Sequence, residues 1–268
     1  MAAGESLLRR GDHGWRMGLG NLLAQENGKW WKTRQRVVRA LIWALMLCGI
    51  LAAALFGAQG TGGTDAERVE KALTLFALIG GIFPPIMLTI LAQDALIGEK
   101  QSGTAAWVLS KPVSRVAVIV SKLTANALGG LVTMVLIPGA VSYVLLAITT
   151  GQLLAVPLFL AGLAIMFVNA LFYLSLTILL GTVFDSRGPV IGIPLLVVLG
   201  FQLVLGVVPW LTNVMPWGLI FPTEQAPSVA VSLFEGQAPL SWLPLVCSGA
   251  WIVLFVAMAI RRYGRQEF

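Results

Sequence analysis

Five long stretches of the chain contain no Asp, Glu, Lys or Arg, and they determine its organisation. They are residues 40–64, 72–93, 123–184, 188–223 and 236–260. A helix crosses the hydrocarbon core of a bilayer in about 20 residues, so each stretch is long enough to do so. The stretch at 123–184 would form a helix of roughly 90 Å, too long for one crossing. The polar sequence ITTGQL divides it near its middle.

The pattern therefore predicts an all-α membrane protein with one domain, residues 1–268, and six transmembrane helices. The spans are expected at residues 40–59, 72–93, 123–148, 153–184, 189–209 and 242–260. Composition agrees, because 57% of the residues are hydrophobic and only 11% are charged, whereas soluble domains carry about a quarter charged residues.

The positive charges predict the orientation. Sixteen of the 18 Lys and Arg residues fall in residues 1–39, 94–122, 185–188 and 261–268, and two, Arg68 and Lys71, fall on the other side. The positive-inside rule then places both termini in the cytoplasm. We expect a multi-pass protein of the cell (inner) membrane. The net charge of +6 follows from this topology and from anionic lipid, and does not indicate nucleic-acid binding.

Two segments outside the spans have their own character. Within the cytoplasmic region 1–39, residues 19–37 mix tryptophans with basic residues, which is typical of an interfacial elbow helix; a solvated basic tail is the alternative. Residues 210–241 are apolar but interrupted by four prolines, which favours short helices that re-enter the membrane from the outside.

The sequence holds few groups for chemistry. Gly28-Lys29 is followed by Trp30, so no phosphate-binding P-loop is present, and the single histidine, His13, lies in the polar arm. We expect no catalytic residue, metal or cofactor in this chain, which is then not an enzyme by itself. The polar residues within the expected spans are Asn126, Asn169 and Gln202, and such residues either hydrogen-bond between helices or line a path. Separately, a kink is expected at Pro84 and Pro85.

The cytoplasmic loop at residues 94–122 is predicted to be ordered and partly helical, and not a flexible linker. Ser102 can begin a short helix through Leu109 with an apolar face, and Pro112 suits the first turn of the next helix. Arg115 and Lys122 are expected near the lipid head groups. This arrangement indicates a docking element for a cytoplasmic partner, or else a helix that rests on lipid.

The loop resembles the signature loop of the type-2 export permeases of ABC transporters, which have the type V fold. The resemblance is carried by the string GEKQSGTAAWVLSKPVSRVAVIVSKL at 98–123, which has the acid, the Gly-Thr pair, the Pro-Val-Ser-Arg run and the later Lys. Many members have a second acid where this chain has Gln101 and Ser102. The elbow helix, six spans, coupling loop and re-entrant segment extend the resemblance over most of the chain.

The resemblance implies the membrane subunit of an ATP-driven exporter. The implied partners are separate cytoplasmic ABC ATPases, which would bind ATP and Mg, a second permease copy or homologue, and the bilayer. It implies a coupling role for Glu99, Gly103, Thr104, Leu109, Pro112 and Arg115, and a translocation path near Pro84, Pro85, Gln202 and Asn169. The alternative is a membrane scaffold that docks a cytoplasmic protein and transports nothing; the cargo is left open.

Overall fold

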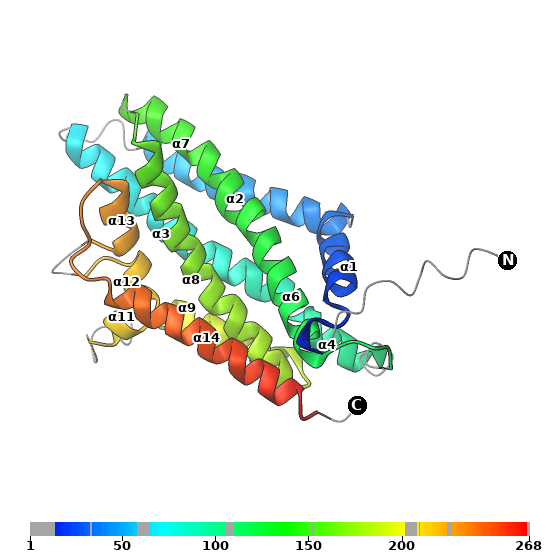
Figure 1. Cartoon of the computed structure of the whole chain (residues 1–268). Helices are drawn as coiled ribbons and strands as arrows, with labels where there is room; N and C mark the ends of the chain where they lie inside the picture. The colour runs from blue at the N-terminus through cyan, green and yellow to red at the C-terminus, as the bar shows by residue number, and fades with distance from the viewer. Residues whose placement is uncertain are drawn as a thin grey trace.

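The computed structural model describes residues 14–32, 34–57, 65–104, 110–151, 153–201, 208, 210–223 and 227–266. The regular elements of these residues are all helices, and the long ones run side by side as a bundle (Figure 1). In chain order they are η2 (Gly14–Arg16), α1 (Leu19–Trp31), α2 (Arg34–Gly57), α3 (Asp65–Ala92), α4 (Asp94–Gln101), α6 (Arg115–Gly130), η4 (Leu131–Leu136), α7 (Ile137–Thr150), α8 (Val156–Val183), α9 (Arg187–Leu199), α11 (Leu211–Val214), α12 (Trp217–Ile220), α13 (Val229–Phe234) and α14 (Leu243–Tyr263).

Four continuous helical segments are long and apolar enough to cross a membrane. They cover Val69–Gln101, Arg115–Thr149, Val156–Val183 and Leu243–Tyr263. The two other predicted spans correspond to shorter apolar helices, Leu41–Gly57 and Arg187–Leu199. The described helices thus support a multi-pass membrane protein, and the count of six crossings stays a prediction.

Helix α8 forms the centre of the bundle. Most of its length is buried, and it packs against α3, α13 and α14. Such a helix is apolar all round rather than on one face, as expected for a core span. Gly162 allows close contact here, because a Cβ on it would lie 2.2 Å from the ring of Phe234 in α13.

The segment predicted to re-enter the membrane contains three short helices, α11, α12 and α13. They lie together at the end of the bundle away from α1 (Figure 1). Trp217, Leu219 and Ile220 of α12 are buried in the same apolar cluster as Phe76 of α3 and Phe159 of α8. The short helices are confirmed, and their depth in a membrane stays a prediction.

The third predicted span contains an irregularity. Residues Leu131–Leu136 form a π-helix between α6 and α7, directly before Pro138 in the first turn of α7. Proline has no N–H for the carbonyl one turn earlier, and wider π turns relieve such gaps inside long helices. The irregular turn therefore lies where Pro138 removes a helical hydrogen bond.

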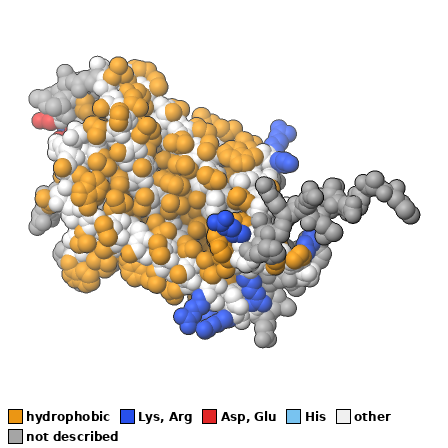
Figure 2. Space-filling model, in the orientation of Figure 1, with side chains coloured by type: hydrophobic (Ala, Val, Ile, Leu, Met, Phe, Trp, Pro, Cys, Tyr) orange, Lys and Arg blue, Asp and Glu red, His pale blue; other side chains and the backbone are white. Residues whose placement is uncertain are grey.

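Charge separates the two ends of the bundle. The end that holds α1, α4 and the last turn of α14 carries the Lys and Arg side chains visible in Figure 2, with a broad hydrophobic surface beside it. We call it the basic end. The predicted separation of positive charge from the apolar spans is therefore present in three dimensions.

Candidate functional site

A cluster of four charges, two of them buried, lies at the basic end, where α1, α4 and α6 meet. Lys122 of α6 is only 2% exposed. Its Nζ lies 3.0 Å from Oε1 of Glu26 in α1 and 2.5 Å from Oε1 of Glu99 in α4. Lys29 of α1 completes the cluster, at 2.7 Å from Glu26 and 3.5 Å from Glu99. Two ammonium groups thus balance two carboxylates, which is the condition for burying such charges.

The electrostatics of Glu26 follow from these neighbours. Burial alone would raise the pKa of its carboxyl group, but the positive charges of Lys122 and Lys29 and their hydrogen bonds outweigh burial, so the pKa lies below its usual value of 4.5. Glu26 is therefore ionised at neutral pH and holds α1 against α6.

Trp30 of α1 makes two further contacts with α6, to Asn126 and to Gly129. The indole Nε1 of Trp30 donates to Oδ1 of Asn126 at 3.1 Å, and the amide of Asn126 donates to the Lys122 carbonyl at 2.7 Å. Gly129 gives the ring its place, because a Cβ there would lie 2.3 Å from the Trp30 ring. The expected interhelical role of Asn126 is confirmed.

The first half of the 94–122 loop is bonded to the end of α8. Nζ of Lys100 donates to the carbonyls of Thr182 and Phe184 at 3.5 and 3.4 Å and pairs with Asp185 at 3.1 Å. The last carbonyls of a helix have no partner within it, and a cation placed there satisfies them. Lys100 therefore ties the loop to α8 while stabilising that helix end.

The second half of the loop is bonded to the end of α14 in the same way. Nη1 of Arg115 donates to the carbonyls of Tyr263, Gly264 and Gln266, at 3.3, 2.7 and 2.8 Å. Ser114 caps α6 by accepting from the Ala117 N–H at 2.9 Å, and its hydroxyl also bonds to the carbonyl of Trp15. Both arms of the loop are thus fixed at their base.

The described part of the loop tip is exposed. Gly103 and Thr104 lie just past α4, where Gly103 has a φ of +69°, a conformation that favours glycine after a helix. Pro112 is exposed on the returning arm. Leu109 lies outside the described residues. The predicted coupling residues therefore divide into an exposed tip and a base, Glu99 and Arg115, held by other helices.

Two expectations for this loop are wrong, those for Lys122 and Pro112, and the expected helix cap at Ser102 stays a prediction. Lys122 is not near the head groups but buried, because two carboxylates compensate its charge. Ser102 is the C-cap residue of α4, and its hydroxyl donates to the Gly98 carbonyl at 2.7 Å. Pro112 precedes the next helix, which begins at Arg115 because Ser114 provides the cap. A helix through Leu109 lies outside the described residues.

One of the predicted path residues, Asn169, bonds to the turn of α3 that precedes the two prolines. Pro84 and Pro85 lie within α3, and Pro85 has no N–H for the carbonyl of Gly81. The buried amide of Asn169 in α8 donates to that carbonyl at 2.8 Å. The interhelical hydrogen bond expected for Asn169 is confirmed, and a path role for it stays a prediction. Gln202 lies outside the described residues.

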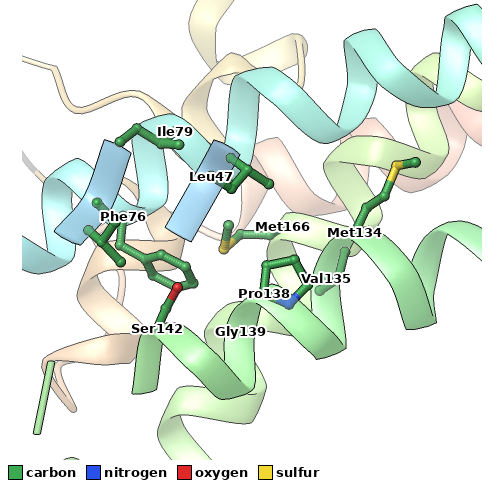
Figure 3. Close-up of a pocket in the computed structure, with 11 residues that line it drawn as sticks. Leu47, Phe76, Ile79, Met134, Val135, Pro138, Gly139, Ser142 and Met166 are labelled. Atoms are coloured by element: carbon green, nitrogen blue, oxygen red, sulfur yellow. The ribbon is translucent and has the colours of Figure 1, made fainter. Parts of the chain in front are cut away.

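A small cavity lies between α2, α3, η4, α7 and α8 (Figure 3). Phe76, Pro138, Ser142 and Met166 are among its lining residues. Its volume is about 10 Å³, close to the minimum for one water molecule. This cavity therefore has no room for a substrate inside the described chain.

One feature of the sequence points to the charge cluster, namely the isolated acidic residue Glu26. Glu26 is the only carboxylate between residues 13 and 64, in a segment rich in Lys and Arg. It also precedes Trp30 by four residues, so both lie on one face of α1. A lone acid on the apolar face of a basic helix points to a buried partner, although its identity required the fold.

Comparison with known proteins identifies the class. The apolar helices of the described residues are those of a membrane protein, and the family model described as ABC-2 family transporter protein matches residues 32–268. The chain belongs to this family, which includes the permease subunits of ABC transporters.

Two curated relatives are similar to the chain over most of their length. The probable ABC transporter permease protein NosY of Pseudomonas aeruginosa is 24% identical over 251 residues, covering 83% of this chain and 87% of the relative. The protein of the same name from Stutzerimonas stutzeri is 23% identical over 275 residues, covering 92% and 98%.

Proposed function

We propose that this permease subunit couples ATP hydrolysis by a separate cytoplasmic ATPase to export of a substrate. One observation carries the proposal: the 94–122 loop has an exposed tip and a base bonded to the helices of the bundle. Lys100 connects it to α8 and Arg115 to the end of α14, while Glu99 connects it to α1 and α6. Because the base of the loop is bonded to several helices, a displacement of the tip would move those helices with it.

The division of the loop assigns roles. Gly103, Thr104 and Pro112 would contact the ATPase because they are exposed in the described part of the tip, and Leu109 would contact it by the resemblance alone. Glu99 would act at the base, because its carboxylate faces Lys122 and Lys29, and Arg115 would act through the carbonyls at the end of α14. Motion of the ATPase would then tilt α1 and α6 together.

The substrate would pass between two permease subunits, one of them this chain. The cavity beside α3 is too small for cargo, which favours a path at an interface over one inside the chain. Pro84, Pro85 and Gln202 remain the residues to test, with Asn169 as the support of the α3 kink. Both termini would be cytoplasmic, in keeping with the positive-inside rule.

Affinity purification from native membranes with mass spectrometry tests the partner. An ATPase that co-purifies in near one-to-one ratio supports the proposal. Purification without an ATPase would favour the scaffold alternative.

The complex in nanodiscs then tests coupling. Glu99→Arg should retain the bound ATPase but lower substrate-linked ATP hydrolysis, and Glu99→Gln should lower it less. Lys71→Glu, an exposed charge of α3 near the opposite end, is the control and should change nothing. Unchanged hydrolysis and transport in Glu99→Arg would contradict the coupling role of this residue.

A further inference from the structure

An apolar groove lies between α1, α2 and the η4–α7 segment, next to the charge cluster. Trp30, Ala44 and Thr133 form its floor and are at least nine-tenths buried. Trp31, Leu41 and Ile137 form its rim and are about half exposed. Its volume is about 120 Å³, far larger than the interior cavity beside α3.

The polar groups of the floor are already bonded, which leaves the groove lining apolar. The Trp30 Nε1 donates to Asn126, and the Thr133 hydroxyl donates to the Gly129 carbonyl at 2.7 Å. The lining offers no donor or acceptor from these side chains, so a polar ligand would lose its hydrogen bonds to water here. The groove suits a hydrocarbon chain.

The groove opens on the lipid-facing side of the bundle. Beyond Ile137, the exposed residues Val141, Val144 and Ile148 continue along one face of α7 at helical spacing. On α2, Leu45 is 72% exposed one turn past Leu41. An exposed apolar surface of this extent belongs in the hydrocarbon of a bilayer, and the groove is a recess in it.

Positive charge marks the polar end of the groove. Arg34 lies one turn before Val37 on the same face of α2 as Leu41 and Ala44, and Lys32 directly follows Trp31. Both side chains are exposed. The order from cation to tryptophan to apolar floor matches an anionic phospholipid, with its head group at the surface and its acyl chain inside.

We propose that the groove between α1, α2 and α7 is a binding site for one anionic phospholipid of the bilayer. Its acyl chain lies on Trp30 and Ala44, and its phosphate meets Arg34 and Lys32. The bound lipid contacts the ring of Trp30. Because the indole N–H of Trp30 donates to Asn126, the lipid helps to hold α1 against α6 beside the charge cluster.

Photolabelling of the full-length protein in nanodiscs tests the site. The probes are phosphatidylglycerol and phosphatidylcholine with a diazirine in the acyl chain, each in an equimolar mixture of the two unlabelled lipids. We expect phosphatidylglycerol to label peptides that contain Trp31 and Ile137 more than phosphatidylcholine does. Ala44→Trp should remove this labelling by filling the groove, and Leu45→Trp, on the outward face, should retain it.

The charge variants test the head-group contact without touching the core. Arg34→Gln and Lys32→Gln should each lower the preference for phosphatidylglycerol by up to about fivefold, the effect of one surface cation, and Arg261→Gln at the end of α14 should not. Equal labelling by both lipids, or labelling that survives Ala44→Trp in a protein that elutes like the wild type, would overturn the proposal.

Discussion

Lys122 and Glu26 are 96 residues apart in the chain, yet their charged groups lie 3.0 Å from each other inside the protein. The pair joins α1 to α6. It places a charge cluster at the base of the loop through which we expect an ATPase to act.

Replacement of Lys122 tests this pair. Lys122→Met leaves Glu26 with Lys29 alone, and we expect the free energy of unfolding to fall by about 2–4 kcal/mol, because a broken buried pair leaves an uncompensated charge. SDS titration in mixed micelles gives the measurement. Lys71→Met, at an exposed site, is the control. Lys122→Glu should destabilise the protein as well, and the reversed pair E26K/K122E should be more stable than this single variant. A double variant no more stable than K122E would argue against a direct pair.

The pH dependence of stability provides a second test. The pKa of Glu26 in the folded protein lies below 4.5, so its ionised form contributes stability above pH 4.5 and loses it as pH falls through the folded pKa. Thermal unfolding in detergent should therefore separate wild type from Glu26→Gln above pH 4.5. The two should converge at lower pH, and a constant difference would show that the charge of Glu26 is irrelevant.

The Asn169 bond to α3 can be tested by a double-mutant cycle. Asn169→Leu should cost about 1–2 kcal/mol, because the Gly81 carbonyl loses its donor. In a Pro85→Ala background residue 85 again has an N–H, so Asn169→Leu should cost less. Pro84→Ala restores a donor one residue away and should leave the cost unchanged. Equal costs in all three backgrounds would show that Asn169 does not serve the proline kink.

The contact of Trp30 with α6 requires a glycine. Gly129→Ala places a Cβ 2.3 Å from the Trp30 ring, and we expect it to displace α1, to lower the unfolding temperature and to increase proteolysis within residues 14–32. Gly49→Ala, which meets no atom within 4 Å, should be neutral or stabilising, since alanine favours helix by about 1 kcal/mol. Equal unfolding temperatures and equal proteolysis of the two variants would contradict a close contact between α1 and α6.

Periodicity and charge alone predicted much of this protein. Uncharged stretches located the long helices, because no charged side chain is stable in hydrocarbon without a partner. Prolines located the short helices of residues 211–234. The Pro-Val-Ser-Arg run at 112–115, with its neighbours, indicated the family that the comparison then established.

The tertiary structure decided which polar residues meet. A sequence places Lys122 at the edge of a span, where exposure to head groups is the natural prediction, and nothing local shows that Glu26 and Glu99 will compensate it. The carbonyls bonded by Arg115 and Lys100 carry no sequence signal, because every residue has one. Hydrophobic pattern is a local property of the chain, whereas charge compensation depends on distances that exist only after the helices have packed.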